Sequence, residues 1–399
     1  MRRIWVSMLC IALGFAFSLS TVQAKEGKAN AGKKLLNQKL KNVKPFGKKS
    51  AKKATKSKKS KKKAKKKAKL FDKIKSKKGK NQKFRNAYSL AVISKLVYQA
   101  QRNLKTYRDE KDENRTKKGK IVVGGLVEAA RFERFGLELC NPNMPYFVTK
   151  KNKKNKTIID AQAYLLHNDS SVILAFRGSK EKADWTTNGD ALVHYELKPV
   201  KKYGKKVRVH RGWLNATELV HKQFKLQSEI DKCIKKDGKN RKLLVTGHSL
   251  GGAMATLWTY YFRKKNKVQA VELHTFGAPS AGNKQFVKSF KKLSGKKLKA
   301  YSWVNQDDPV TGVTWTLGFR RTGQPQWISC KGIGQLCKAK NLILKTKMGG
   351  RLAGKGSMHY MTNYIDRVLQ LAPKKVRKEL KALGAGKTVN KFIGKVYKP

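Results

Sequence analysis

The chain has 399 residues and a formal net charge of +70, from 94 Lys and Arg against 24 Asp and Glu. Its 39% apolar content includes 7 Trp, 13 Tyr and 16 Phe, which excludes a chain that is disordered throughout and leaves room for one large domain or two smaller ones. No internal repeat is apparent.

The first 24 residues have the pattern of a secretory signal peptide. Two arginines precede an apolar run over residues 4–17, and the following SLSTVQA ends at the small residue Ala24. An uncleaved membrane anchor is the alternative, although the apolar run is short for a span. Lysines on the mature side work against export, because positive flanks tend to stay cytoplasmic. We favour export, either to the extracellular space or to a periplasm or ER lumen.

Residues 25–83 are nearly all Lys, Ala, Ser, Gly and Asn, as in KKSAKKATKSKKSKKKAKKKAK. Such a segment has little to bury and is expected to be disordered. Three interpretations stay open: a propeptide that is solvated or removed, a segment that binds an anionic membrane or another polyanion, and non-specific binding to nucleic acid. No aromatic interleaving accompanies the lysines, so no specific nucleic-acid partner is expected.

Residues 84–384 have the apolar spacing of a folded domain, and residues 385–399 form a basic tail. Helical spacing covers 87–103, and two strands of alternating pattern follow around a turn at 168–170. The run RKLLVTG is a continuous apolar strand, of the kind that is buried on both faces of a parallel sheet. Further predicted elements are helices at 250–265, 283–293 and 359–372 and strands at 268–276 and 297–305. This alternation predicts an α/β fold with a mainly parallel central sheet flanked by helices.

The RKLLVTG strand runs into Gly-His-Ser-Leu-Gly-Gly, directly before a predicted helix. This is the context of a nucleophile elbow, in which a serine stands on a sharp turn between a buried strand and a helix. Only small residues fit two positions before and after such a serine, and here they are Gly247 and Gly251. Ser249 is therefore the candidate nucleophile. The alternative is a structural serine in a glycine-rich turn, because G-x-S-x-G alone is not a rare pattern.

The order of residues along the chain selects the partners of Ser249. In α/β-hydrolases an acid follows the serine, and a histidine follows the acid. The residues available for these two roles are His274, His359, Glu272, Asp307 and Asp308. Glu272 lies two residues from His274 within one predicted strand, so those two cannot face each other across a site. The order therefore selects His359 as the base, with Asp307 or Asp308 orienting it. The alternatives are a turn cap for the aspartates and a helix start for His359.

Several motifs together resemble the class 3 lipases, the fungal-lipase-like α/β-hydrolases. They are LAFRGS, VHRGW, GHSLGGAMA, TFGAPSAGN and NQDDPV, followed by His359. The resemblance covers roughly residues 84–384, and the combination is specific although each motif alone is weak. It implies an α/β-hydrolase fold and catalysis by a Ser-Asp-His triad. The family's aspartate stands three residues after the Asn of its VN pair, which maps to Asp308 and leaves Asp307 as a neighbour.

The resemblance also implies an oxyanion hole. The serine of FRGS, which maps to Ser179, supplies one contact, and the backbone N–H of Leu250 after the nucleophile supplies the other. Two positions depart from the family pattern: Ser280 replaces a usual Arg in GAPSAGN, and DDPVTG lacks a proline that the family often has after Val. Neither is a triad position. No metal or cofactor motif is seen, and none is needed.

Four cysteines lie beyond the predicted signal peptide, an even number for an oxidising compartment. Cys330 and Cys337 are close enough in sequence to close a small loop, so we expect that pair. Cys140 and Cys233 are then what remains. The alternative is four buried thiols.

These features predict a secreted serine carboxyl-ester hydrolase, a lipase or esterase that cleaves acylglycerol or related lipid esters. The family's lid corresponds to residues 180–191, KEKADWTTNGDA, which are poor in apolar side chains and predict a weak dependence on a lipid interface. One alternative is a phospholipase A1-type activity on anionic lipid surfaces. Another is a non-catalytic polyanion-binding protein that keeps a hydrolase fold.

Overall fold

The computed structural model describes residues 69–74, 81–99, 121–124, 130–151, 157–178, 197–199, 207–263, 270–294, 298–306, 308–315, 318–329, 338–339 and 359–386. Several predictions fall outside these residues. They are the signal peptide, the Lys-rich segment up to residue 68, the lid stretch, residues 387–399 of the tail, Ser179, Asp307 and the Cys330–Cys337 pair.

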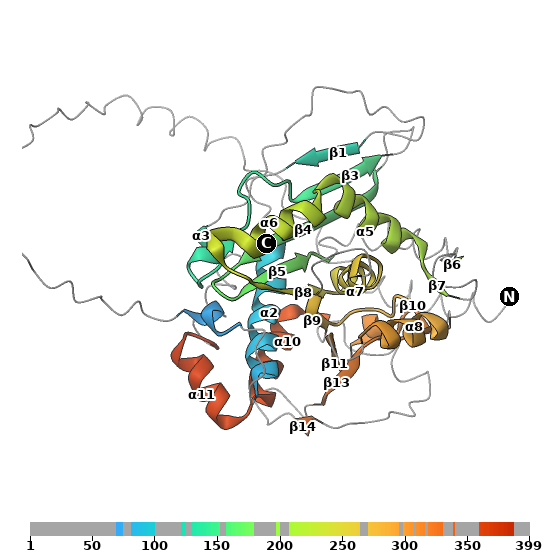
Figure 1. The fold of residues 1–399 in the computed structure, drawn as a ribbon. Coiled ribbons are helices and arrows are strands. Elements are labelled where there is room, and N and C mark those ends of the chain that lie inside the picture. Colours follow the sequence, from blue (N-terminus) through green and yellow to red (C-terminus); the bar gives the residue numbers. More distant parts are fainter. Residues whose placement is uncertain are drawn as a thin grey trace, which may run out of the picture. The chain divides into compact units, whose positions relative to one another are not determined.

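A ten-stranded mixed sheet forms the centre of the domain, in the order β1-β3-β4-β5-β8-β9-β11-β13-β14, with β2 paired to β4 (Figure 1). Its strands are β1 (Ile121–Gly124), β2 (Glu138–Leu139), β3 (Phe147–Lys151), β4 (Thr157–His167), β5 (Ser171–Phe176), β8 (Lys242–His248), β9 (Ala270–Phe276), β11 (Lys299–Asn305), β13 (Gln324–Ser329) and β14 (Lys338–Ala339). The five strands from β5 to β13 are parallel to one another, and the flanking pairs are antiparallel. The predicted, mainly parallel centre is therefore confirmed.

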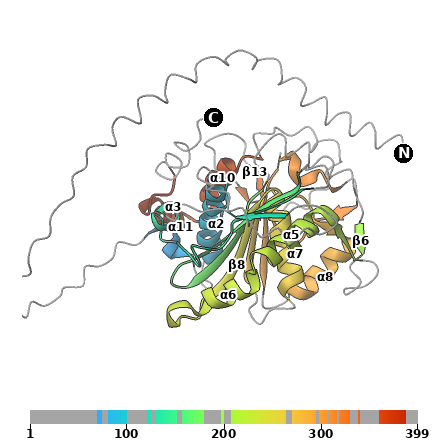
Figure 2. The same ribbon diagram turned by 90° about the horizontal axis from the view of Figure 1, so that it is seen from above.

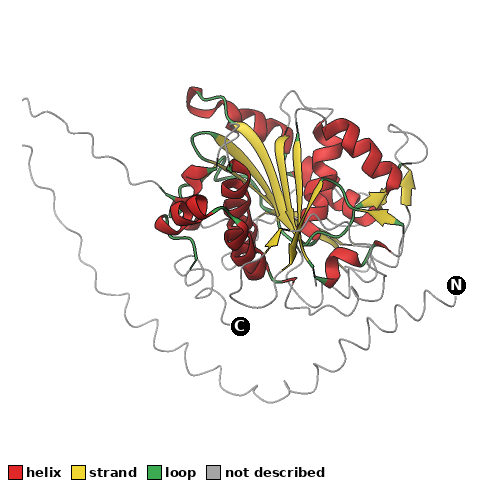
Figure 3. Cartoon of the chain, turned by 90° about the horizontal axis from the view of Figure 1, so that it is seen from below, coloured by secondary structure: helices red, strands yellow, loops and turns green. Residues whose placement is uncertain are grey.

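Helices cover both faces of this sheet, with α2 and α10 on one face and α5 and α7 on the other (Figures 2 and 3). The helices are η1 (Leu70–Lys73), α2 (Gln82–Gln99), α3 (Ala130–Glu133), α5 (Arg211–Gln223), α6 (Leu226–Lys235), η4 (Lys236–Gly238), α7 (Leu250–Arg263), α8 (Lys284–Ser294), η5 (Pro309–Gly312), α10 (Met361–Leu371) and α11 (Lys374–Ala382). None of the helices in the described part of the chain is long and apolar enough to cross a membrane.

A second, small sheet has the order β12-β10-β7-β6. Its strands are β12 (Phe319–Arg320), β10 (Gly282–Asn283), β7 (Arg208–His210) and β6 (Leu197–Pro199), all antiparallel. The sequence pattern did not predict this sheet, because strands of two or three residues are too short to show alternation.

The folded part begins earlier than the sequence predicted. Leu70, Phe71 and Ile74 are buried to within 1% exposure, and η1 packs against α2. The α2 helix begins at Gln82 rather than at residue 87. The predicted disordered segment at 25–83 was therefore wrong at its end, where three apolar side chains among lysines anchor the chain to the core. At the other end, Gly386 N–H still donates to the Tyr88 hydroxyl at 3.1 Å.

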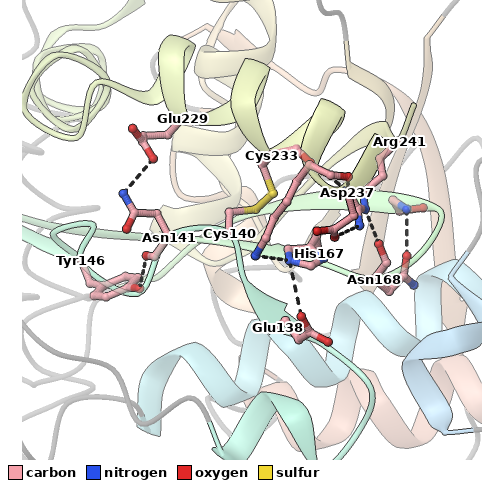
Figure 4. The surroundings of a disulfide bond; sticks show 12 residues. Glu138, Cys140, Asn141, Tyr146, His167, Asn168, Glu229, Cys233, Asp237 and Arg241 are labelled. Atoms are coloured by element: carbon pink, nitrogen blue, oxygen red, sulfur yellow. Dashed lines mark hydrogen bonds and ion pairs between the residues drawn. A yellow bond between two sulfur atoms is a disulfide. The ribbon is translucent and has the colours of Figure 1, made fainter. Parts of the chain in front are cut away.

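A disulfide joins Cys140, directly after β2, to Cys233 in α6 (Figure 4). The two cysteines are 93 residues apart in sequence and their Cα atoms are 5.4 Å apart. Beside the bridge, Asn141 donates to Glu229 at 3.0 Å, so a side-chain hydrogen bond parallels the covalent link. From the sequence we expected Cys330 to pair with Cys337, which left Cys140 and Cys233 as the second pair. The structure joins those two.

Candidate active site

Ser249 stands on the predicted sharp turn, between the end of β8 at His248 and the start of α7 at Leu250. It is 4% exposed and its φ is +57°, a left-handed conformation that a residue with a side chain seldom adopts. Its backbone N–H donates to Phe276 O at 3.0 Å, and its carbonyl accepts the N–H of Gly252 at 2.9 Å. The surrounding structure therefore holds Ser249 in a strained turn of the kind that occurs at functional sites.

The two glycines predicted for the elbow are required by close backbone contacts. A Cβ at Gly247 would overlap the backbone of Gly251, and a Cβ at Gly251 would overlap the carbonyl of Phe176 at the end of β5. A Cβ at Gly178 would lie 3.1 Å from the Cβ of Ser249. The chain leaving β5 thus passes directly beside the serine, although Ser179 itself lies outside the described residues.

Leu250 is the first residue of α7 and is half-buried. The backbone N–H groups in the first turn of an α-helix have no acceptor within the helix. They point out of its N-terminal end, beside the residue that precedes the helix. The N–H of Leu250 therefore belongs to the positive end of a helix that starts at Ser249.

His359 and Asp308 lie in contact although 51 residues separate them. The Nδ1 atom of His359 is 3.0 Å from Oδ1 and 2.9 Å from Oδ2 of Asp308. Asp308 follows the end of β11 and is 1% exposed, whereas His359 precedes α10 and is half-buried. Because an ionised carboxylate only accepts, Nδ1 carries the proton and Nε2 is the unprotonated nitrogen of the neutral ring.

Two more donors fix the Asp308 carboxylate. The Tyr364 hydroxyl on α10 donates to Oδ2 at 2.6 Å, and the backbone N–H of Val310 donates to Oδ1 at 2.9 Å. The N–H of Asn305 donates to the Tyr364 oxygen at 3.1 Å, which leaves the hydroxyl proton for Asp308. Burial, followed by the charge of Asp308, raises the pKa of Tyr364 well above its usual value, so this hydroxyl keeps its proton.

His248, the neighbour of Ser249, links the serine to the backbone of His359. Its Nε2 lies 2.8 Å from the His359 carbonyl oxygen and its Nδ1 lies 2.9 Å from the Tyr98 hydroxyl. A carbonyl only accepts, so Nε2 is protonated and Nδ1 accepts from Tyr98. Burial, with the nearby His359 and Lys95, lowers the pKa of His248 well below its usual value and keeps the ring neutral. The His248 and His359 ring centroids are 4.5 Å apart.

Gly277 makes room for this arrangement. Its φ is +58°, and a Cβ there would lie 2.8 Å from Oδ2 of Asp308 and 3.1 Å from Nδ1 of His359. The end of β9 can approach the pair this closely only because the residue is glycine.

The second histidine considered from sequence, His274, is committed to the core. Its Nε2 lies 3.1 Å from Glu272, and its Nδ1 accepts from the Trp303 indole at 3.1 Å. Burial raises the pKa of Glu272, but hydrogen bonds from His274 and Asn86 outweigh it and the net shift is downward. These contacts agree with the exclusion of Glu272 and His274 from the Ser249 site. The two side chains do, however, lie side by side and interact with each other.

Tyr364, Tyr98 and Gly277 were missed by sequence reasoning. Tyr364 and Tyr98 are ordinary members of amphipathic or buried helices, and nothing in their spacing marks a polar role. Gly277 could have been found as the glycine that ends a buried strand within TFGAPSAGN. Among the residues that the structure describes, no three His, Cys, Asp or Glu side chains gather as a metal site would require.

Comparison with known proteins shows which family this part of the chain resembles. Residues 173–317 match the family model for Lipase (class 3). Over 181 residues the chain is 29% identical to secreted mono- and diacylglycerol lipase 1 of Fusarium solani, which covers 43% of this chain and 48% of the relative. It is 26% identical over 225 residues to the chloroplastic phospholipase A1-Igamma1 of Arabidopsis thaliana, covering 47% and 42%. The chain thus spans about half the length of the curated relatives that it matches, or less.

Solved lipase structures are also similar. The native propeptide complex of Rhizomucor miehei lipase matches with a TM-score of 0.43 at 18% identity, covering 73% of this chain and 80% of that one. Lipase II from Rhizopus niveus matches with a TM-score of 0.44 at 19% identity, covering 70% and 98%. Residues 173–317, which build the centre of the sheet and carry Ser249 and Asp308, are thus similar to the class 3 lipases.

Proposed function

We propose that the protein is a carboxyl-ester hydrolase that cleaves acylglycerol or related lipid esters through an acyl-enzyme on Ser249. Asp308 orients His359, and His359 acts as general base and then as general acid. The backbone N–H of Leu250 and the residue Ser179 stabilise the oxyanion. No metal or cofactor takes part in this scheme.

In the first half of the reaction, His359 Nε2 takes the proton of the Ser249 hydroxyl while Oγ attacks the ester carbonyl carbon. The carbonyl oxygen becomes negative in the tetrahedral intermediate, beside the N-terminus of α7. The bond to the alcohol oxygen then breaks, and His359 returns the proton to that oxygen. Water repeats the sequence in the second half and releases the fatty acid from Ser249.

One observation carries the proposal. Ser249 is held at a φ of +57° at the tip of a strand-to-helix turn, and the neighbouring His248 is bonded to the backbone of the histidine that contacts Asp308. A structural serine would not need this strain, nor a histidine–carboxylate pair tied to the residue beside it.

Replacing the nucleophile tests the proposal. Ser249→Ala should lower turnover of the soluble ester p-nitrophenyl butyrate by several powers of ten, because the acyl-enzyme cannot form. Ser289→Ala, on the half-buried flank of α8, is the matched control and should retain activity. Turnover by Ser249→Ala that equals the control would favour the non-catalytic polyanion-binding alternative.

A phospholipase A1-type activity is the second candidate, and similarity to phospholipase A1-Igamma1 favours it. The relative from Fusarium solani is named for mono- and diacylglycerols, so the relatives support both ester classes. Fatty acid released from a phospholipid, compared with that released from a diacylglycerol by the same preparation, decides between them.

We also propose that the protein is secreted, with its signal peptide cleaved after Ala24. The support is the pattern of residues 1–24 and the secreted relatives. N-terminal sequencing of protein recovered from the medium tests the cleavage site. The Lys-rich segment that follows is proposed to hold the enzyme near anionic lipid or another polyanion.

A further inference from the structure

Most of the positive charge lies outside the Lys-rich segment. Residues 1–68 contain 22 Lys or Arg and one acid, so 49 of the 70 net positive charges belong to the chain beyond residue 68. A hydrolytic site of the kind described does not require a folded domain of this charge. The excess of positive charge therefore indicates that the surface of the domain has a further role.

Three stretches of this part of the chain contain no Asp or Glu and together carry 23 of its 49 net positive charges. Residues 197–217, 273–306 and 309–365 hold 7, 7 and 9 Lys or Arg respectively. They supply the whole small sheet, α8, β11 and the start of α10, together with the turn that carries Gly277. These stretches thus surround the carboxyl ends of the parallel strands, where Asp308 and His359 lie. We call this side of the central sheet its carboxyl edge, or simply the edge.

Five exposed cations of these stretches gather around the small sheet, and we name them the basic rim. They are Arg208, Arg211, Lys284, Lys288 and Arg320. The central strand of the small sheet, β10, brings their backbones together. Gly282 of β10 pairs with Arg320 on one side and with Val209, next to Arg208, on the other.

The remaining cations of the basic rim lie at the starts of the two helices that leave this sheet. Arg208 N–H donates to the Asn283 side chain at 3.2 Å, directly before Lys284 opens α8. Arg211 opens α5 directly after β7, and Lys288 follows Lys284 by one helical turn.

The basic rim is tied to the candidate active site through the backbone after β9. Arg321, next to Arg320, donates to Ala278 O at 3.3 Å and to Thr311 O at 2.9 Å. Ala278 follows Gly277, the glycine that packs against Asp308 and His359. The rim and the candidate site therefore belong to the same edge of the sheet.

An exposed aromatic side chain lies on this edge as well. Tyr360, directly after His359, is 65% exposed and is the single exposed large hydrophobic residue of the described part of the chain. Tyrosine is enriched at membrane–water interfaces, where its ring sits at the level of the headgroups. Cations together with an exposed tyrosine favour a lipid surface over a nucleic acid, which would be stacked on several aromatic rings.

We propose that the basic rim docks the folded domain onto an anionic lipid surface, with the edge that carries Ser249 and His359 turned toward that surface. The inference rests on the proposed function in that it takes the ester substrate to be lipid. It differs from a role of the Lys-rich segment, because the rim is fixed to the fold and sets an orientation that a flexible polycation does not set.

The test compares two variants of the full chain that have the same net charge. The rim variant is R208Q/R211Q/K284Q/K288Q. The control is K374Q/K375Q/K378Q/K381Q, which removes four exposed lysines from α11. Figure 1 shows α11 at the opposite end of the domain from β7 and β10. All eight side chains are exposed, so both variants are expected to fold, and K284Q/K288Q against K378Q/K381Q repeats the comparison with fewer changes.

Binding to phosphatidylcholine vesicles with and without phosphatidylserine is the measurement. Each Lys or Arg near an anionic bilayer strengthens binding, so the rim variant should bind phosphatidylserine vesicles at least about ten-fold more weakly than the control. Equal weakening of the two variants, or no weakening of either, would overturn the proposal. So would a rim variant that loses affinity for duplex DNA while it keeps its affinity for the vesicles.

Turnover of p-nitrophenyl butyrate separates this inference from the proposed function. Both variants should hydrolyse the soluble ester at the wild-type rate, because no rim residue contacts the ester in the proposed scheme. An inactive wild-type protein would contradict the proposed function, and the vesicle comparison would still decide whether the rim binds anionic lipid.

Discussion

Asp308 accepts three hydrogen bonds, and the donors come from different parts of the fold. They are the His359 imidazole before α10, the Tyr364 hydroxyl within α10 and the Val310 backbone in η5. A buried carboxylate with this many donors has one orientation available to it. The orientation of His359 therefore depends on how α10 packs, as well as on Asp308.

Tyr364 is expected to position the pair, and Tyr364→Phe should lower kcat/KM for p-nitrophenyl butyrate by roughly ten-fold, the effect of one hydrogen bond to a charged group. The loss should appear in kcat with little change in KM, because a misoriented imidazole slows the chemical step and leaves ester binding intact.

The matched control is Tyr301→Phe, on a half-buried tyrosine of β11. A role of Tyr364 in packing alone would lower the free energy of unfolding in urea without lowering kcat per folded molecule. That result would contradict a positioning role.

For individual residues, the sequence was sufficient to predict a member of the candidate site where the evidence lies in a few neighbouring residues or in the order of residues along the chain. Ser249 could be predicted because the elbow needs Gly247 and Gly251 within five residues of one another, and His359 because few histidines follow the serine. Tyr364 and Tyr98 could not be predicted, since their partners are set by the packing of α10 and α2 onto the ends of β11 and β8. The choice of Asp308 over Asp307 came from family resemblance, and the contact with His359 supports it.

Among the elements, the turn that joins β4 to β5 is held from both sides, at the opposite end of β5 from Ser249. The Asn168 side chain accepts from the N–H groups of Ser170 and Ser171 at 2.9 and 2.8 Å, as the turn predicted from sequence requires. It also donates to Phe71 O at 2.8 Å. The Cys140–Cys233 bridge then joins the strand beside β4 to α6. This end of the domain is therefore braced independently of the candidate site.

Removing the bridge tests that independence. Cys140→Ser with Cys233→Ser should lower the free energy of unfolding by about 4 kcal/mol, because cross-linking residues 93 apart restricts the unfolded chain strongly. Urea unfolding measures the loss, and turnover of p-nitrophenyl butyrate per folded molecule should not change. Equal stability of the variant and the wild type under oxidising conditions would contradict a closed bridge. Cys330→Ser with Cys337→Ser is the comparison, and its loss of stability should be smaller, because the loop that this predicted pair closes is much shorter.

The long elements that were predicted agree with the structure to within about five residues, but the helices α5, α6 and α11 were not predicted, and neither were the short elements. The strand β4 runs up to the predicted turn at 168–170, and α7 follows Ser249 as expected. The small sheet and η1 were missed because their apolar residues are too few to show a period. Around η1, lysines also outnumber the apolar residues, which hides the apolar pattern.

For the whole molecule, the position of η1 decides how much of the basic N-terminus is dispensable. Deleting residues 25–66 should leave the stability and the soluble-ester turnover unchanged and should weaken retention on anionic vesicles at low salt. Extending the deletion to residue 80 removes Leu70, Phe71 and Ile74, whose burial contributes on the order of 5 kcal/mol. Urea unfolding of the two deletions measures this difference. Equal midpoints would contradict the anchoring role of η1, and equal retention by the shorter deletion and the wild type would contradict lipid targeting by the segment.

His359 is attached to the rest of the site at two points, and this limits where the length of the chain can change without disturbing the site. The chain leaves the site after Asp308 and returns at His359, where the ring is bound to Asp308 and the carbonyl to His248. Each doubling of a connecting loop adds only about 0.6 kcal/mol of closure entropy. Insertions or deletions between β14 and His359 are therefore compatible with an unchanged arrangement of Asp308 and His359 as long as both attachments persist, and related proteins are free to differ in length there.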